Sequence, residues 1–470
     1  MRFDLADDAP LYTDMYELTM AQGYFLEGLA DRTACFDYFF RSNPFGGGYV
    51  IFSGLSDVVE LLEHFRFDDN ALSYLAEQGF QKEFLDHLEA MEFTAELMAP
   101  PEGEVVFPYE PVVRIKGPIM QAQIVETLLL NLLNFSSLIA TKASRMRRVA
   151  GDRKLIDFGL RRAQGLGGMQ ASRAAVVGGF DSTSNVLAGR RDNLEISGTQ
   201  AHSWIQSFED ELDAFRAYAR RFPDKCILLV DTYDTLNSGV PNAIKVAGEL
   251  REKGHELVGI RLDSGDLAYL SKRARRMLDD AGFEDVKIAA SNQLDEHVIK
   301  SLLHEQDAKI DVFGVGTQLV TAYDDAALDG VYKLCEVDEQ PRIKVSEAYQ
   351  KVNFPGAKQV YRLFDDDGLF YGDAVALEHE EHVEHMYHPY EPYKDVAVGD
   401  YEQKPLLRTV MAGGEIVAEL HDVQQAKAYA RRRLMQLPDE HQRFDNPHIY
   451  KVGLSEALHQ LRNATLERLK

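Results

Sequence analysis

The stretch GIRLDSGDL (259–267) decides the fold, because a buried strand ends there in charged and small residues. The strand, LVGIRL, is a nearly continuous apolar run, as expected for a parallel strand that is covered on both faces. The Ser-Gly-Asp that follows is typical of a helix start. A strand that ends in Arg261 and Asp263 and then turns into a helix presents those side chains at one rim, and in (β/α) barrels chemistry takes place at that rim.

The same arrangement recurs at IDFGLRRAQG (156–165), ISGTQAHSW (196–204) and VFGVGTQLV (312–320). Between about 155 and 320 the chain alternates between strand candidates and helical stretches. The strand candidates are LIDFG, LEISGT, CILLVD, LVGIRL, VKIAAS and IDVFGV. A βα repeat of roughly 25–30 residues predicts a parallel sheet with helical crossovers, either a barrel or a doubly wound sheet.

The flanking segments have a different pattern. Helical stretches at 14–23 and 70–85 alternate with strand-like ones such as 33–40, which is typical of an α+β layer. Short strands return after about 355, followed by a charged helix at 423–437. We therefore predict an N-terminal α+β domain at 1–125, an α/β barrel catalytic domain at 126–355, and a C-terminal segment at 356–470 that packs on the N-terminal domain.

Charge excludes several classes of partner. The chain has 470 residues and a formal net charge of −25, which argues against non-specific binding to nucleic acid or to an anionic membrane. Its most apolar stretch, 124–140, is too polar and too short for a membrane span, which predicts a buried or interface helix. The acidic N-terminus has no basic-then-apolar signal segment, so a cytoplasmic protein is expected.

The three cysteines, Cys35, Cys226 and Cys335, lie far apart and include no CxxC pair. This fits a reducing compartment and gives no metal-ligand pattern.

Arg261 and Asp263 are the strongest candidates for function. Arginine can bind a carboxylate or a phosphate with two parallel hydrogen bonds. The neighbouring carboxylate can accept hydrogen bonds from ribose hydroxyls or help to hold a hydrated Mg²⁺. A helix cap with a surface ion pair is the structural alternative.

Other rim residues admit two interpretations each. Thr317 lies in a glycine-spaced turn that can cradle phosphate, although such turns also occur without a ligand. His202 starts a helix after a strand and could act in acid–base or phosphoryl chemistry, or simply cap the helix. Arg161 and Arg162 follow one strand, and we expect Arg161 to point into the site.

Taken in order, these segments resemble the nicotinate phosphoribosyltransferase family, a branch of the type II phosphoribosyltransferases. Further matching segments are LYTDMYELTMAQGYF (11–25), FFRSNPFGGGYVIFSGL (39–55), GGFDSTSNVLAG, SNQLDE, GVYKL and KVNFPGAKQVYR (351–362). The resemblance spans about three-quarters of the chain and weakens beyond about 365. It implies an irregular parallel (β/α) barrel with a flanking α+β domain built from the N- and C-terminal segments.

The resemblance also implies a reaction. Family members join nicotinate to 5-phosphoribosyl 1-diphosphate for NAD synthesis, with Mg²⁺, and couple the step to ATP hydrolysis through a phosphohistidine that falls on His202. It implies nicotinate contacts at Tyr16, Thr199 and Arg261 and a phosphate contact at Thr317. Related enzymes are homodimers in which residues at the positions of Asp14 and Tyr16 reach into the partner's site. Less specific base or phosphoribosyl contacts fall on Arg41, Arg161 and Asp263.

Two alternatives stay open at the level of sequence. A nicotinamide phosphoribosyltransferase would need an acceptor for a carboxamide, whereas GLRRAQG and the GGFDSTS loop look like a carboxylate-binding pattern. A non-catalytic phosphate-binding barrel would keep the fold and lose the site, and the joint presence of His202, Arg261, Asp263 and Thr317 argues against it. Quinolinate phosphoribosyltransferases share the fold but are much shorter.

Overall fold

A computed structural model describes residues 8–345, 353–391 and 393–469. The first seven residues of the acidic N-terminus, and Lys351 and Val352 of the KVNFPGAKQVYR segment, lie outside the described residues. The chain forms two compact units, one made of 1–138 and 327–470 and the other of 139–326. The predicted boundaries were 125/126 and 355/356. The second unit ends earlier than 355 because the two strands at Gly330–Val337 and Gln340–Pro341 belong to a sheet of the first unit.

The unit 139–326 contains one parallel sheet of six strands. Its members are β6 (Lys154–Asp157), β7 (Ser182–Thr183), β8 (Ile227–Leu229), β9 (Gly259–Leu262), β10 (Lys287–Ser291) and β11 (Val312–Val315). The strand order is β7–β6–β11–β10–β9–β8, so the first strand of the set pairs with the last. A doubly wound sheet reverses its strand order at a switch point, whereas this order runs consecutively around a ring that is open between β7 and β8. The fold class is therefore the predicted α/β type, with parallel strands in barrel order.

One predicted strand is nearly lost. In LEISGT only Ile196 takes part in the sheet, through a single parallel bridge to Thr183 beside β7. Ser197, Gly198 and Thr199 follow Ile196, so the segment has no further apolar side chain that would favour a longer strand.

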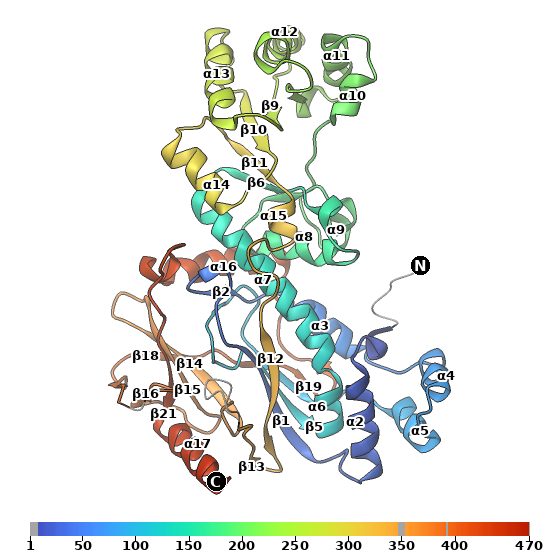
Figure 1. Cartoon of the computed structure of the whole chain (residues 1–470), viewed down its shortest axis with the longest axis vertical. Coiled ribbons are helices and arrows are strands. Elements are labelled where there is room, and N and C mark those ends of the chain that lie inside the picture. Colours follow the sequence, from blue (N-terminus) through green and yellow to red (C-terminus); the bar gives the residue numbers. More distant parts are fainter. Residues whose placement is uncertain (1–7, 346–352, 392, 470) are drawn as a thin grey trace. The chain divides into compact units, whose positions relative to one another are not determined.

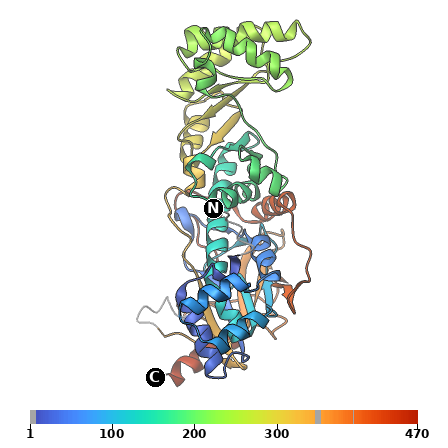
Figure 2. The same ribbon diagram turned by 90° about the vertical axis from the view of Figure 1, so that its right-hand side faces the viewer.

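Helices follow most strands of this unit. They are α8 (Gly167–Val177), α9 (Val186–Arg191), α10 (His202–Gln206), α11 (Glu211–Arg221), α12 (Val240–Arg251), α13 (Leu267–Asp280), α14 (Glu296–Lys300) and α15 (Thr317–Val320). Asp266 caps α13 by accepting a hydrogen bond from the Tyr269 backbone N–H, and Ala274 and Leu278 lie on its buried face. Figure 1 and Figure 2 show α11, α12 and α13 side by side as a layer next to strands β9 and β10, and α13 packs on both strands.

The other unit contains two larger sheets. The seven-stranded sheet has the order β13 (Gln340–Pro341), β12 (Gly330–Val337), β1 (Thr33–Phe40), β5 (Val113–Pro118), β3 (Glu96–Ala99), β19 (Arg408–Ala412) and β20 (Glu415–Ile416). The six-stranded sheet has the order β17 (Asp395–Ala397), β16 (His385–Tyr387), β21 (Val452–Ser455), β15 (Phe370–Leu377), β14 (Lys358–Phe364) and β18 (Glu402–Pro405). A short ladder joins β2 (Val50–Ile51) to β4 (Val105–Val106).

Helices complete this unit. They are α2 (Met15–Leu26), α3 (Leu55–Glu63), α4 (Asp69–Glu77), α5 (Lys82–Ala90), α6 (Ile119–Ile124), α16 (Val423–Gln436) and α17 (Glu456–Arg468). The single helix predicted over 70–85 is two helices, because the chain turns at Gly79 with φ of +92°. The long helix α7 (Glu126–Ala150) begins in this unit and ends in the other.

A buried ion network joins the two sequence halves of this unit. The fully buried guanidinium of Arg362 lies 2.7 Å from Glu104 and 2.6 Å from Asp373, whose side chains are fully buried as well. Arg433 adds a second contact to Glu104 at 2.7 Å. Removing one partner of such a buried pair leaves a charge without compensation, so these contacts fix the C-terminal strands against the N-terminal segment.

Across the described residues, no helix combines the length and the apolar character needed to cross a bilayer.

Candidate active site

Strands β6, β9, β10 and β11 end at one edge of the parallel sheet, and a cavity lies there. The register pairs Arg261 with Ala289, and Ser291 with Gly314, which brings the ends of β9, β10 and β11 together. The cavity opens to solvent and has a volume of about 260 Å³. It is lined by Phe158, Arg161, Arg162, Arg261, Asp263, Ser291, Asn292, Gln293, Gly314, Gly316 and Thr317.

Arg261 is the centre of the site. Its guanidinium donates from Nε to Ser291 Oγ at 2.9 Å, from Nη1 to Thr199 Oγ1 at 2.7 Å and from Nη2 to Asp263 Oδ1 at 2.8 Å. The guanidinium carbon also lies 5.3 Å from the centre of the Phe158 ring. An arginine has five N–H donors, so three bonds fix its plane and two donors stay available to a ligand.

Asp263 is held as a carboxylate. Burial by itself raises the pKa of Asp263, but hydrogen bonds from Ser291 and Arg261 and the nearby charge of Arg261 bring that pKa below its ordinary value. An ionised carboxylate at this position can accept hydrogen bonds from ribose hydroxyls and stabilise positive charge.

His202 begins α10 and lies beside Asp263. Its Nε2 is 3.7 Å from Asp263 Oδ2, and its Nδ1 is 3.1 Å from Thr232 Oγ1. The side chain is 40% exposed, so a dissolved nucleotide can reach the ring. The structure thus brings together Thr199 and His202 of the segment 196–204 with Arg261 and Asp263 of the segment 259–267.

The Gly-Thr turn and the arginine pair form other parts of the cavity wall. Both Arg161 and Arg162 line it, so the structure does not favour Arg161 over its neighbour. Thr317 lines it too, directly after Gly316. Asn292 and Gln293 have φ of +88° and +49°, in the left-handed region of backbone conformation that residues other than glycine rarely adopt. Strained backbone of this kind concentrates at ligand-binding sites.

Sequence reasoning missed several residues of the site, among them Ser291, which contacts both Arg261 and Asp263. Phe158 lies within the segment 156–165. Its position under Arg261 depends on Gly314, where a Cβ atom would lie 2.3 Å from the ring. Asp231 and Thr232 follow β8, the CILLVD strand, and the rule applied to the other strand ends would have found them. Asp231 Oδ2 accepts hydrogen bonds from the Asp263 backbone N–H at 2.9 Å and from the hydroxyl of Ser264 at 2.6 Å.

Asp14, Tyr16 and Arg41 belong to the other unit and are described within it. Asp14 precedes α2, and its backbone N–H donates to Thr127 Oγ1 at 3.2 Å. Tyr16 is 47% exposed on the first turn of that helix. The guanidinium of Arg41 lies 5.4 Å from the Phe39 ring centre, and its Nε is a buried donor without a partner among the described residues. None of these three side chains lines the cavity described above.

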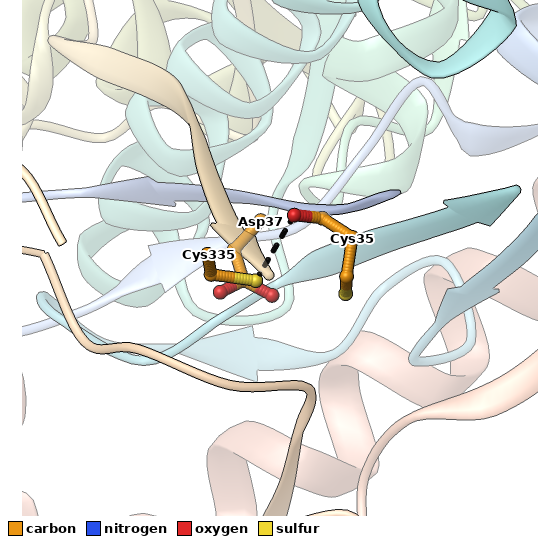
Figure 3. Close-up of side chains that lie close together, drawn as sticks. All are labelled: Cys35, Asp37 and Cys335. Atoms are coloured by element: carbon orange, nitrogen blue, oxygen red, sulfur yellow. Dashed lines mark hydrogen bonds between the residues drawn. The ribbon is translucent and has the colours of Figure 1, made fainter. Parts of the chain in front are cut away.

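A separate buried cluster contains Cys35, Asp37 and Cys335, with ligand atoms all within 4.8 Å of one another (Figure 3). Pairing of β1 with β12 brings the two cysteines together, which spacing in the sequence did not reveal. The Asp37 carboxylate already pairs with the Lys358 ammonium at 2.7 Å, and burial raises the pKa of the Cys335 thiol, which donates to the Cys35 carbonyl at 3.2 Å. Zinc needs deprotonated thiolates and usually a fourth ligand, so the cluster does not fit a metal.

Three family models match the chain. They are described as the nicotinate phosphoribosyltransferase N-terminal domain over 11–134, the nicotinate phosphoribosyltransferase family over 153–390, and the corresponding C-terminal domain over 357–462. The match therefore continues through residue 462, well beyond residue 365, near which the resemblance of the motifs weakens.

Individual relatives agree with the family models. Nicotinate phosphoribosyltransferase of Bacillus subtilis is 42% identical over 461 residues, which cover 96% of this chain and 94% of the relative. The crystal structure of human nicotinic acid phosphoribosyltransferase matches with a TM-score of 0.86 and 34% identity, covering 96% of this chain and 99% of that one. Nicotinate-nucleotide pyrophosphorylase from Pyrococcus furiosus matches with a TM-score of 0.71 and 25% identity, covering 93% and 97%. By its sequence, its fold and the segments that build its rim, the chain belongs to the nicotinate phosphoribosyltransferase family.

Proposed function

We propose that this chain joins nicotinate to 5-phosphoribosyl 1-diphosphate, releases diphosphate, and couples the step to ATP hydrolysis through a phosphate carried on His202. The nicotinate mononucleotide formed would enter NAD biosynthesis. The observation that carries the proposal is the position of Asp263, which is hydrogen-bonded to Arg261 on the wall of an open cavity and lies 3.7 Å from His202.

The base needs a cation for its carboxylate and a flat apolar surface for its ring. Arg261 keeps two donors available after its bonds to protein, and its plane is fixed by Ser291, Thr199 and Asp263. The Phe158 ring beside it offers a flat face. A charge-assisted pair in such a pocket favours the acidic base over the neutral carboxamide.

The sugar phosphate needs the opposite charges. Breaking the bond to diphosphate develops positive charge on the ribose ring, which the Asp263 carboxylate can stabilise, and negative charge on the leaving group. Arg161 and Thr317 are the cation and the hydroxyl on the cavity wall that suit the phosphates. Mg²⁺ on the diphosphate supplies further charge neutralisation when bound, and the carboxylates of Asp263 and Asp231, whose Oδ1 is a buried acceptor without a partner among the described residues, are suitable oxygen ligands.

His202 fits the role of phosphoryl acceptor. A neutral imidazole is a good nucleophile, and its phosphoramidate is labile. The ring is partly exposed and lies next to Asp263, so a phosphate placed on it would be close to the sugar site.

A homodimer with shared sites completes the proposal. Asp14, Tyr16 and Arg41 would contact the substrates bound by the other subunit, with exposed Tyr16 packing on the base. The unpartnered Nε of Arg41 supports a role in binding an anion. A cytoplasmic location remains a prediction from the sequence.

Diphosphate release measured in parallel with nicotinate, nicotinamide and quinolinate, with and without ATP, tests the activity. We expect nicotinate to be used best and ATP to increase its apparent affinity. Preference for nicotinamide would contradict the role of Arg261, and turnover of none of the three bases would refute the assignment.

His202→Ala tests the coupling. The variant should lose ATP hydrolysis and the ATP-driven rise in nicotinate affinity, yet keep a slower transfer without ATP because Arg261 and Asp263 remain. Incubation with γ-labelled ATP should leave acid-labile, base-stable label on the wild type and none on the variant. A variant that keeps ATP-stimulated synthesis would show that His202 is structural.

A further inference from the structure

The two ring nitrogens of His202 face different groups. Nδ1 lies 3.1 Å from the hydroxyl oxygen of Thr232, which is hydrogen-bond distance. Nε2 lies 3.7 Å from Asp263 Oδ2, too far for a hydrogen bond but close enough to feel its charge. Thr232 therefore contacts Nδ1, whereas Nε2 faces the rim where Arg261 and Asp263 lie.

A phosphoryl acceptor needs a nitrogen lone pair that ATP can reach. In a neutral imidazole one nitrogen holds the proton and the other holds the lone pair. The carboxylate of Asp263 by itself favours the proton on Nε2, which would direct the lone pair at Thr232 and away from the nucleotide. A hydrogen bond from Nδ1–H to Thr232 Oγ1 favours the opposite tautomer.

We infer that Thr232 is the positioning residue that holds the proton of His202 on Nδ1 and so makes Nε2 the nitrogen that takes the phosphoryl group. The inference rests on the proposed ATP-coupled function. In the step, the Nε2 lone pair forms a bond to the γ-phosphorus of ATP while the bond from that phosphorus to the ADP oxygen breaks, and ADP leaves with the electron pair. The Nδ1 proton stays on the ring, hydrogen-bonded to Thr232.

Neighbouring contacts hold Thr232 in this position. Asp231, the residue before it, accepts hydrogen bonds from the backbone N–H of Asp263 and the hydroxyl of Ser264, so the loop after β8 is tied to the loop after β9. Two residues further on, Asp234 accepts hydrogen bonds from two backbone N–H groups of the following helical turn. Thr232 and Asp263 are thus fixed on two sides of the His202 ring.

Thr232→Val removes the hydroxyl at nearly constant shape, and Thr232→Ser keeps it. Thr235→Val, at the start of the helical turn that follows, is a matched control. Each protein is incubated with γ-labelled ATP, the rate of acid-labile label is followed, and an alkaline hydrolysate is separated against both phosphohistidine isomers. We expect the wild type to carry the Nε2 isomer. Loss of one hydrogen bond predicts labelling about 3- to 10-fold slower for Thr232→Val, with some Nδ1 isomer, while the serine and control variants stay within about twofold of wild type.

Label on Nδ1 of the wild type, or a Thr232→Val variant that labels at the wild-type rate, would overturn the inference. A wild type that takes no label would overturn the phosphohistidine proposal itself and this inference with it, so the two failures are distinguishable. Diphosphate release without ATP and the melting temperature show whether Thr232→Val is folded. If it is not, the isomer on the wild type and the rate of Thr232→Ser still decide the question.

Discussion

Replacing Arg261 by alanine should change which base the enzyme prefers. The guanidinium makes three hydrogen bonds to protein, at 2.9 Å to Ser291, 2.7 Å to Thr199 and 2.8 Å to Asp263, and keeps two donors for a ligand. Loss of a buried charge-assisted bond to the nicotinate carboxylate costs roughly 2–5 kcal/mol, which is about 30- to several-thousand-fold in kcat/KM. Nicotinamide has no carboxylate to lose, so its kcat/KM should fall much less.

Part of the loss will be common to both bases, because Arg261→Ala also leaves Asp263 without its cation. Asp263→Asn measures that shared part, since it disturbs the ribose side and keeps the guanidinium. Initial rates of diphosphate release with each base, taken without ATP, give kcat/KM for the wild type and both variants. If Arg261→Ala lowers kcat/KM equally for nicotinate and nicotinamide, the arginine serves the phosphates and our assignment of the base pocket is wrong.

Three further perturbations have defined outcomes. Gly314→Ala should raise the KM for nicotinate and lower the melting temperature, because the new Cβ would lie 2.3 Å from the Phe158 ring and overpacking costs about 1–3 kcal/mol. An unchanged KM would exclude the ring from the base site. Mixing Tyr16→Ala with Arg261→Ala, each impaired with nicotinate, should restore part of the activity through hybrid dimers with one intact site. No recovery despite proven subunit exchange would contradict shared sites. Burial raises the pKa of Glu17 to about 7, so the folded state binds a proton that the unfolded state releases, and stability is lost as pH rises from about 4.5 through 7. Glu17→Gln should therefore gain roughly 2–3 kcal/mol of stability relative to wild type between pH 5 and pH 8. Thermal melting of both proteins at the two pH values measures this gain.

The sequence predicted the site residues best where reactive side chains follow a single buried strand. Arg261 and Asp263 follow a buried strand and are joined in the structure by a direct ion pair. Thr232 was missed although its strand was identified, because its hydroxyl gains a role only through the hydrogen bond to His202, which lies 30 positions away in the sequence. The Gly79 turn was also present in the sequence as a helix stop within 70–85.

Contacts between distant segments could not be predicted from spacing. Cys35 and Cys335 meet only because β1 pairs with β12, and nothing local to either cysteine encodes that pairing. The same holds for Arg362 and Glu104, which are 258 positions apart and form a buried pair. The division after residue 326, in place of the boundary expected at 355, has a related reason, because β12 pairs with β1 of the other unit and nothing local to 330–337 encodes that pairing.

The pairing of β1 with β12 has a consequence for how the chain is made. Residues 33–40 leave the ribosome almost 300 residues before their partner at 330–337, so β1 can pair only with β5 during most of synthesis. Seven of its eight residues are buried in the finished sheet, so in the nascent chain one edge of an apolar strand has open hydrogen-bonding groups. The unit at 139–326 is continuous in sequence and can fold while that edge of β1 is still unpaired. Chains that stop before residue 330 should therefore aggregate through β1 even though every rim residue from Phe158 to Thr317 has been made.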